Sequence, residues 1–412
     1  MRAIVLAAGE GRRMRPLTDT RPKALLEVGG ATVIDHVLSA LKAAGVTEAA
    51  VVVGYMADPL VKHLEAGTPV PVRTYRQARA LGTGDALRAA AEFVRGETLV
   101  VNGDVLPHAD DVRAVAQAEG PGAEVVLLTA EVADPARYGV VQTERPQGGG
   151  PARVTRLLEK PERPAGRHVN AGVYRMGPPL LERLAAAAPS PRGEVELTSA
   201  VAAAATDRAA YAVAAERPWT EVGRPWDLLA AQERLFASLK DRTEGEVEKG
   251  AHLKGSVFVA KGALVKAGAY IEGPVYIGPD ARVGPNCYLR ASTHIGRGCH
   301  VGAATEVKNS ILFAEANAPH HNYVGDSVLG SNVNLGSGTK IANLRLDERE
   351  VFVSIGGERV GTGLRKFGAV LGDSVRTGVN ASINAGCVVG PGAFIGPGAR
   401  ASGTVEAGAR VM

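Results

Sequence analysis

Glycines and cations gather in one short stretch near the start of this 412-residue sequence, directly after an apolar run. Gly9 and Gly11 would let backbone N–H groups approach a phosphate closely, and Arg15 and Lys23 would neutralise its charge. Asp104 follows another apolar run in the triplet Asn-Gly-Asp. The glycines together with the two cations predict a phosphate-binding site, whereas two glycines alone would be a weak signal.

The segments around these residues predict a mostly parallel, doubly wound α/β sheet, because short apolar runs alternate with helical patterns up to residue 235. Apolar residues from Ile34 to Leu41 have the spacing of a helix face, and Gly45 would end that helix. Ligands bind such sheets beyond the carboxyl ends of the strands, where Gly9–Lys23 and Asn102–Asp104 would lie. The expected strands are 3–7, 50–53, 72–75 and 98–101, with a further helix near 85–94.

A different period governs the rest of the chain, where large apolar residues recur at every sixth position. This spacing is typical of a parallel β-helix, in which each hexapeptide makes a short strand and a turn and points one aliphatic side chain inward. The phase resumes from Tyr323 to Ile341 and from Leu371 to Ile395, so 314–322 and 344–368 are predicted loops. The unbroken series is Val259, Val265, Ile271, Ile277, Val283, Leu289, Ile295, Val301, Val307 and Phe313.

These two patterns divide the chain into a predicted α/β domain over 1–236, a polar linker over 237–250 and a β-helix over 251–412. The formal net charge of +4 and 4% aromatic residues argue against a nucleic-acid-binding protein. No apolar run is long enough for a membrane span, and the N-terminus does not resemble a signal peptide. Cys287, Cys299 and Cys387 are too few for a disulfide framework and are expected to be small apolar fillers, so a cytoplasmic location is expected.

The N-terminal motifs resemble those of sugar-1-phosphate nucleotidylyltransferases over nearly all of residues 1–230. The resemblance begins with the segment from Leu6 to Thr18, which contains Ala8, Gly9, Gly11 and Arg15, and with the pair Pro22-Lys23. It continues in the family's order through Gln77, Leu81–Gly84, Asn102–Asp104, Tyr138–Val140, Glu159–Pro161, Asn170–Gly172, Glu194–Thr198 and Trp219–Gly223.

The resemblance implies that a sugar-1-phosphate oxygen attacks the α-phosphorus of UTP or dTTP and that pyrophosphate leaves. Asp104 would hold Mg²⁺ together with Glu221, which stands where the family usually has Asp or Asn, while Arg15 and Lys23 would screen the phosphates. The implied nucleotide-binding residues are Leu6, Ala8, Gly9, Gly11, Gln77, Gly82 and Thr83, with Gln77 pairing with a pyrimidine edge. The implied sugar-phosphate-binding residues are Gly139, Glu159, Lys160 and Asn170.

Each of these residues also has a plainer interpretation. Asp104 can cap a turn after a strand, as Asn-Gly-Asp often does. Glu159 and Lys160 can form an exposed ion pair of little energetic value, and Gln77 can be an ordinary surface residue. Their joint occurrence in the family's order favours the functional interpretation.

The C-terminal half resembles the acetyltransferase site of the archaeal-type bifunctional sugar-1-phosphate nucleotidylyltransferase/acetyltransferases. The resemblance implies a left-handed β-helix that forms a homotrimer and transfers acetyl from acetyl-CoA to an amino-sugar phosphate. An ammonium group is not a nucleophile, so a base is needed, and the motif assigns that role to His320 and not His321. Arg290 and Lys308 would hold the phosphate, Tyr323 and Asn334 the sugar, and Asn343 the amine or thioester. Where the resembling group has lysines after this asparagine, the sequence has Arg349 and Phe352, with Lys366 as a further candidate.

Three functions therefore stay open from the sequence. The chain is a two-site enzyme, or a monofunctional nucleotidylyltransferase whose β-helix only drives oligomerisation, or a non-catalytic regulatory subunit of the same ancestry. A regulatory subunit predicts degraded phosphate motifs, whereas Arg15, Lys23 and Asp104 are all present.

Overall fold

The computed structural model describes residues 1–144, 150–190 and 193–412, and the chain divides into two compact units. The first unit consists of Met1–Glu10, Pro22–Leu25 and Val33–Glu221. The second consists of Gly11–Arg21, Leu26–Thr32 and Val222–Met412. The phosphate-type signature is thus split between the units, since Gly9 and Lys23 belong to the first and Gly11 and Arg15 to the second.

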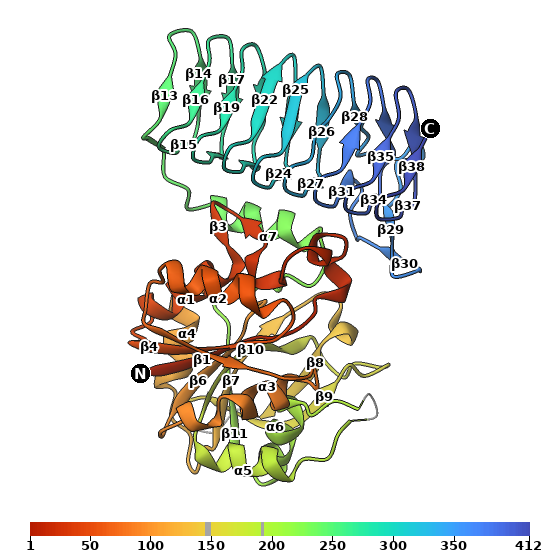
Figure 1. Cartoon of the computed structure of the whole chain (residues 1–412). Coiled ribbons are helices and arrows are strands. Elements are labelled where there is room, and N and C mark those ends of the chain that lie inside the picture. The colour runs from red at the N-terminus through yellow and green to blue at the C-terminus, as the bar shows by residue number, and fades with distance from the viewer. Residues whose placement is uncertain (145–149, 191–192) are drawn as a thin grey trace. The chain divides into compact units, whose positions relative to one another are not determined.

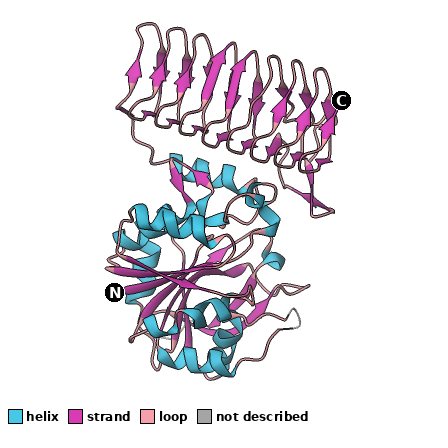
Figure 2. Ribbon diagram, viewed as in Figure 1, coloured by secondary structure: helices cyan, strands magenta, loops and turns pink. Residues whose placement is uncertain are grey.

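The first unit is an α/β fold with a single mixed sheet, flanked by helices (Figure 2). The strand order is β5-β4-β1-β6-β10-β7-β11-β9-β8. The bounds are β1 Arg2–Ala7, β4 Glu48–Val53, β5 Val72–Arg76, β6 Thr98–Asn102, β7 Val125–Glu131, β8 Gly139–Glu144, β9 Ala152–Glu159, β10 His168–Met176 and β11 Ala210–Ala214. Its α-helices are α1 Val33–Ala43, α2 Ala57–Ala66, α3 Thr83–Ala89, α4 Ala109–Gln117, α5 Pro178–Ala186 and α6 Leu197–Thr206, and its 3₁₀ helices are η3 Lys23–Leu25, η4 Ala91–Phe93 and η5 Pro135–Arg137.

The predicted doubly wound region is confirmed in strands β5, β4, β1 and β6, which are mutually parallel. The continuous apolar sequences of β4, β1 and β6 fit strands covered on both faces, and β1 is buried from Ala3 to Leu6. The edge strand β5 has the more polar sequence VRTYR. The remainder of the sheet is mixed, because β10 runs antiparallel to both β6 and β7. Among the described residues no helix separates β8, β9 and β10 along the chain, and parallel pairing would need such a crossover.

The second unit is a parallel β-helix whose short strands lie one above another in register (Figure 1). Each strand pairs with the next strand on its own face, which in the regular coils lies three hexads later, as Val259 pairs with Ile277. The first face contains β12 Arg242–Thr243, β15 Val257–Val259, β18 Val275–Ile277, β21 Thr293–Ile295, β24 Ile311–Leu312, β27 Val328–Leu329, β31 Ala369–Leu371, β34 Cys387–Val389 and β37 Thr404–Val405. The second face contains β13 Glu246–Val247, β16 Leu264–Val265, β19 Arg282–Val283, β22 His300–Ala303, β25 Asn317–His320, β32 Arg376–Thr377, β35 Phe394–Ile395 and β38 Arg410–Val411. The third face contains β14 His252–Lys254, β17 Tyr270–Glu272, β20 Tyr288–Leu289, β23 Glu306–Lys308, β26 Tyr323–Gly325, β28 Lys340–Ile341, β33 Ser382–Ile383 and β36 Arg400–Ala401.

The parallel ladder begins inside the predicted linker 237–250. There β12 pairs with β15 and β13 pairs with β16. The second unit also contains the 3₁₀ helices η1 (Arg12–Met14) and η2 (Leu17–Asp19), the hairpin β2–β3 (Glu27–Val28 and Ala31–Thr32) and helix α7 (Asp227–Phe236). These segments precede the ladder in sequence but cluster with it in space.

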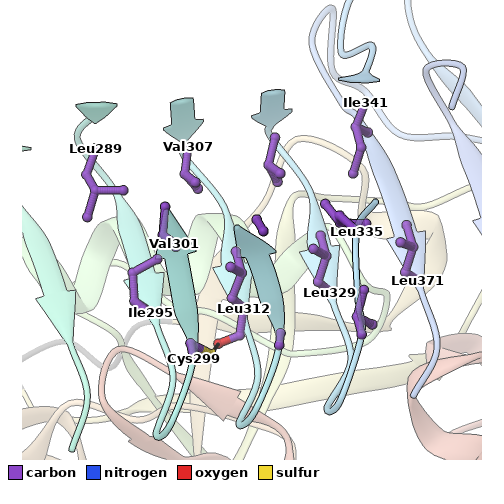
Figure 3. Packing of buried hydrophobic residues seen from close by; sticks show 14 of the residues in the cluster. Leu289, Ile295, Cys299, Val301, Val307, Leu312, Leu329, Leu335, Ile341 and Leu371 are labelled. Atoms are coloured by element: carbon purple, nitrogen blue, oxygen red, sulfur yellow. Dashed lines mark hydrogen bonds between the residues drawn. The ribbon is translucent and has the colours of Figure 1, made fainter. Parts of the chain in front are cut away.

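The core of the β-helix consists of aliphatic side chains that point inward and stack from coil to coil (Figure 3). The predicted positions from Val259 to Val307 are all fully buried there. The assignment of Phe313 to this series is wrong, because Leu312 pairs with Ile295 and occupies the core position. The phase at Tyr323 is likewise wrong by one residue, since Val324 pairs with Val307.

The predicted loop at 314–322 is wrong, because β25 lies within it and pairs with β22. The step from Val307 to Leu312 is five residues rather than six, so a strict six-residue template loses the phase there although the coil continues. The segment 344–368 does leave the ladder and carries the hairpin β29–β30 (Phe352–Ile355 and Glu358–Gly361).

The cysteines are free thiols buried in the coil, as expected for apolar fillers. Burial raises the pKa of Cys287 and of Cys299 to about 12. It has the same effect on Cys387. These thiols therefore stay protonated at neutral pH and are poor nucleophiles.

We predict that Ile295→Ala lowers the free energy of unfolding of the β-helix by about 2–5 kcal/mol, because Ile295 is fully buried between stacked coils. Urea denaturation followed by circular dichroism measures the change. Val379→Ala is the control, since Val379 is 53% exposed, and its effect should stay within about 0.5 kcal/mol. Equal effects of the two substitutions would contradict the assigned core.

Among the described residues, no helix is long and apolar enough to cross a membrane.

Candidate functional site

Lys23 and Asp104 meet in the first unit. Lys23 opens η3, and Asp104 follows the end of β6, which is the strand next to β1. The Lys23 Nζ lies 2.5 Å from the Asp104 Oδ2, and the two side chains are only 16% and 23% exposed. The carboxyl ends of neighbouring parallel strands thus bring together a cation and a carboxylate that are 81 positions apart in sequence.

Glu221 reaches the same strand end through the backbone. The residue after Asp104, Val105, forms an antiparallel bridge with Glu221. The Leu106 N–H also donates to the Thr220 carbonyl at 3.0 Å. The two predicted metal ligands therefore stand on adjoining backbone segments.

The carboxylates of Asp104 and Glu221 fit Mg²⁺, which needs few protein ligands, better than they fit a metal ion whose ligands all come from the protein. Within the described parts of the chain, no cluster of three or more His, Cys, Asp or Glu side chains could hold a metal ion. Mg²⁺ commonly binds through one or two carboxylates together with substrate phosphates. Asp104 and Glu221 would supply that pair, and Lys23 shows that the Asp104 carboxylate accepts a cation.

The predicted base-reading segment is a turn held by hydrogen bonds on both sides. Gln77 is buried, and its Nε2 donates to the Gly82 carbonyl at 3.1 Å and to Asp85 Oδ2 at 2.7 Å. The Leu197 N–H donates to the Thr83 Oγ1 at 3.1 Å. Gln77 is therefore a constrained side chain and not an ordinary surface residue.

Gly82 in this segment has a φ of +102°, and a Cβ built there would lie 2.5 Å from the Val195 carbonyl oxygen. We expect Gly82→Ala to raise the KM for the nucleotide about 10- to 100-fold, since a strained residue costs on the order of 1–3 kcal/mol. Steady-state kinetics of pyrophosphate release measures this change. Gly166→Ala is the control, because no atom lies within 4 Å of its built Cβ. An unchanged KM in Gly82→Ala would remove this turn from the nucleotide site.

The predicted sugar-phosphate residues come together on β8, β9 and β10. Gly139 pairs with Glu159, and the Lys160 N–H donates to the Tyr138 carbonyl at 3.1 Å. The Lys160 Nζ lies 3.5 Å from a Glu159 oxygen with its side chain 44% exposed, so this ion pair is weak and Lys160 can reach a ligand. Asn170 lies on β10, where Val169 pairs with Val140.

Two aromatic residues that support this region were missed as site residues. The Asn170 Nδ2 donates to the Tyr174 hydroxyl at 2.6 Å, and burial raises the pKa of Tyr174. The Trp219 Nε1 donates to the Ala171 carbonyl at 3.0 Å. A β-bulge between Asn170 and Tyr174 creates this arrangement, and a bulge is not visible in a sequence pattern.

The remaining signature residues divide between the units. Leu6 ends the buried part of β1, and Ala8 and Gly9 follow it in the first unit. Gly11 adopts a left-handed conformation with a φ of +63° and belongs to the second unit with Arg15. The Arg15 Nε lies 3.1 Å from the Asp19 Oδ1, and half of its side chain is exposed.

In the second unit, the outer surface of the third β-helix face brings together Arg290, Lys308, Tyr323 and Asn343. The register places Lys308 level with Gly325, and a Cβ built at Gly325 would lie within 3 Å of both Asn343 and the Tyr323 hydroxyl. Burial and then the carboxylates of Glu306 and Asp326 raise the pKa of Tyr323, so its hydroxyl remains a donor.

Asp326 is the centre of this group, although no role was predicted for it. Its buried carboxylate accepts from the Lys308 Nζ at 3.0 Å, from the Asn309 Nδ2 at 2.7 Å and from the Asn343 amide. Arg290 pairs separately with Glu306 at 2.9 Å. The position of Asp326 directly after the Tyr-Val-Gly strand could have suggested it, because a buried carboxylate needs cationic or amide partners.

His320 and Asn334 lie on the second face and not with Tyr323 on the third. His320 ends β25, and its N–H donates to the Asn322 Oδ1 at 3.1 Å. Asn334 bridges Asn317 and Arg376 in parallel register. Burial and then the neighbouring His320 lower the pKa of His300, which keeps His300 neutral at pH 7. A single chain therefore divides the predicted acetyltransferase residues between two faces.

Of the residues that replace family lysines, neither lies on the ladder. The Arg349 N–H donates to the Asp347 Oδ1. The Arg359 guanidinium carbon lies over the Phe352 ring, 4.1 Å from the ring centre. Lys366, by contrast, belongs to an antiparallel bridge with Leu344, and the next N–H, of Phe367, donates to the Asn343 carbonyl at 2.9 Å. Lys366 thus lies beside the Asn343 segment.

Comparison with known proteins gives two family matches. Residues 2–238 match the model described as Nucleotidyl transferase. Residues 271–380 match the model described as GMPPB C-terminal domain.

Individual relatives match almost the whole chain. The bifunctional protein GlmU of Methanococcus maripaludis strain DSM 14266 is 35% identical over 392 residues, which cover 95% of this chain and 92% of that protein. The bifunctional sugar-1-phosphate nucleotidylyltransferase/acetyltransferase of Sulfurisphaera tokodaii is 34% identical over 402 residues, 97% and 96% of the two chains. The probable mannose-1-phosphate guanylyltransferase 1 of Oryza sativa subsp. japonica is 28% identical over 64% of this chain and 73% of its own length.

Proposed function

Because the chain belongs to the family of bifunctional sugar-1-phosphate nucleotidylyltransferase/acetyltransferases, we propose that it makes nucleotide sugars from UTP or dTTP. The acceptor is glucose-1-phosphate or N-acetylglucosamine-1-phosphate, and pyrophosphate is released. The β-helix acetylates an amino-sugar-1-phosphate with acetyl-CoA. The observation that carries the first activity is the Lys23–Asp104 pair, with Glu221 bridged to the residue after Asp104.

In the first reaction, the chain positions an attacking phosphate oxygen in line with the leaving pyrophosphate. Asp104 and Glu221 hold Mg²⁺, which when bound neutralises charge on the reacting phosphates. Lys23 and Arg15 screen the β- and γ-phosphates, which lowers the repulsion that the attacking oxygen meets. Backbone N–H groups of the segment from Leu6 through Ala8 and Gly9 to Gly11 approach the same phosphates.

Substrate choice rests on two sets of contacts. The Gln77 amide pairs with a pyrimidine edge, and Gly82 and Thr83 pack against the base. Lys160 binds the phosphate of the sugar, while Gly139, Glu159 and Asn170 bind its hydroxyl or acetamido groups. The hydrogen bonds that hold Gln77 to Gly82 and Asp85 support its orientation.

In the second reaction, His320 takes a proton from the ammonium of the amino sugar, and the free amine attacks the thioester carbonyl of acetyl-CoA. The C–S bond then breaks, the amide forms with loss of the second amine proton, and coenzyme A leaves as the thiol. Arg290 and Lys308 hold the sugar phosphate, Tyr323 and Asn334 the sugar, and Asn343 orients the amine or the thioester. Lys366 supplies positive charge beside the Asn343 segment in place of the family's lysines.

We propose a homotrimer, because Asn334 and Tyr323 lie on different faces of one coil and a neighbouring copy can bring the two faces together. Light scattering that gives a mass near three chains supports the trimer, and a monomer contradicts it. The free, buried cysteines favour a reducing, cytoplasmic location.

The test of the first activity is a matrix of NTPs against sugar-1-phosphates with Mg²⁺, read by pyrophosphate release. Release with UTP or dTTP supports the proposal, and release with GTP alone contradicts the role of Gln77. Thiol release from acetyl-CoA with glucosamine-1-phosphate or galactosamine-1-phosphate tests the second activity. A pyrophosphate signal without any thiol signal favours the alternative, a monofunctional nucleotidylyltransferase whose β-helix only drives oligomerisation.

A further inference from the structure

Residues 11–21, the part of the phosphate-binding motif that belongs to the second unit, form a loop that we call the signature loop. The C-terminal end of this loop is bound to the β-helix by the carboxylate of Asp373. The Asp373 Oδ2 accepts from the Arg21 Nη2 at 2.5 Å and from the Thr20 Oγ1 at 2.7 Å. Both charged side chains are 17% exposed, so water competes little for this ion pair. The loop and Asp373 belong to the same compact unit.

The anchor is built from turns of neighbouring coils. Phe313 follows β24, Ser331 follows β27 and Asp373 follows β31, and these strands are consecutive on the first face. Arg21 lies over the Phe313 ring at 5.2 Å and donates to the Ser331 Oγ at 2.8 Å. The Ser331 N–H in turn donates to the Asp373 Oδ1 at 2.8 Å. The coil thus offers Arg21 an aromatic surface, a hydroxyl and an oriented carboxylate.

The five-residue step at Leu312 matters for this anchor. It places Leu312 in the core position, whereas Phe313 is outside the core cluster and contacts Arg21. Phe313 is nonetheless fully buried. The cation is therefore covered by an apolar ring and satisfied by a carboxylate, which makes the position specific for arginine.

From this geometry we propose that Asp373 is a positioning residue for nucleotidyl transfer, because it holds the loop that carries Gly11 and Arg15. The inference rests on the proposed nucleotidyltransferase activity. The loop contains only short 3₁₀ turns, η1 and η2, and Arg15 itself is half-exposed. Fixing the loop at Arg21 reduces the conformational freedom that it must lose when it binds the triphosphate.

The test compares full-length wild type, Asp373→Asn and Asp280→Asn. Asn keeps the size of Asp373 but removes the charge that Arg21 meets. We expect the KM for the nucleotide to rise about 10- to 100-fold in Asp373→Asn, because the substitution replaces a charge-assisted hydrogen bond by a weaker neutral one. The kcat and the KM for the sugar phosphate should change less than about threefold. Asp280 is an exposed turn residue of the same β-helix and serves as the matched control, with no expected change.

Hydrogen–deuterium exchange gives a reading that does not depend on activity. Amides of residues 11–21 should exchange faster in Asp373→Asn, with the β-helix peptides unchanged. Arg21→Gln and the double variant complete a cycle, and the double variant should be within about twofold of either single variant.

The outcomes separate this inference from the proposed function. A wild-type protein without pyrophosphate release in the whole substrate matrix overturns the proposed function and the inference with it. An active wild type with an unchanged nucleotide KM and unchanged loop exchange in Asp373→Asn overturns the inference alone. Multiplicative effects of Arg21→Gln and Asp373→Asn would also overturn it, because the two residues would then act independently.

Discussion

Asp104→Asn is expected to lower the kcat for pyrophosphate release about 1,000-fold, because Asn removes the anionic oxygen that faces Lys23 and that we propose as a ligand of the metal. The substitution keeps the size of the side chain, so the fold around the end of β6 should persist. Pyrophosphate release at saturating nucleotide and sugar phosphate measures the effect. Mn²⁺ titration of the same variant, followed by electron spin resonance, gives a reading apart from turnover and should show weaker binding.

Asp110→Asn is the matched control for this prediction. Asp110 is six positions further along the chain, in the first turn of α4, and about half of its side chain is exposed. Its substitution should leave both turnover and Mn²⁺ binding unchanged. If Asp104→Asn released pyrophosphate as fast as an active wild type, Asp104 would be a turn cap and its role as a metal ligand would be contradicted, whereas the regulatory-subunit hypothesis predicts no release by either protein.

His320→Asn is expected to lower thiol release from acetyl-CoA about 100- to 10,000-fold, which is the usual contribution of a general base. Pyrophosphate release should not change, because His320 lies in β25 of the β-helix and the nucleotidyltransferase family match ends at residue 238. Normal pyrophosphate release from the same preparation would therefore show that the His320→Asn variant is folded.

The neighbouring histidine provides the control for this experiment. His321 has a φ of +53° and is exposed like His320. His321→Asn should retain thiol release within about threefold of wild type. Equal losses in the two variants, or a loss in His321→Asn alone, would contradict the assignment of the base to His320.

Much of the fold follows from local patterns. The apolar runs predict β1, β4 and β6, because strands covered on both faces need continuous apolar sequence. The six-residue period predicts the β-helix, because one inward side chain per short strand repeats in every coil. A one-residue deletion such as that between Val307 and Leu312 escapes the template, since the coil tolerates a shorter turn while the pattern loses its phase.

The candidate site was predicted in part by motif order. That order identifies Lys23, Asp104 and Glu221, and the carboxyl ends of parallel strands explain why Lys23 and Asp104 meet. It does not identify Tyr174 or Trp219, whose partners are set by a bulge in β10. The motif order also gives no role to Asp326, because it does not show that this carboxylate is buried among hydrogen-bond donors.

Residue types and their spacing along the chain were sufficient to predict two kinds of structure and the chemistry of each. They could not reveal that Arg21 belongs with Phe313, Ser331 and Asp373. That grouping requires three coils to stack in register, and the stacking persists although the excursion of 344–368 lies between Ser331 and Asp373 in sequence. Contacts between residues more than 300 positions apart depend on the accumulated register of the whole ladder, which no local pattern contains.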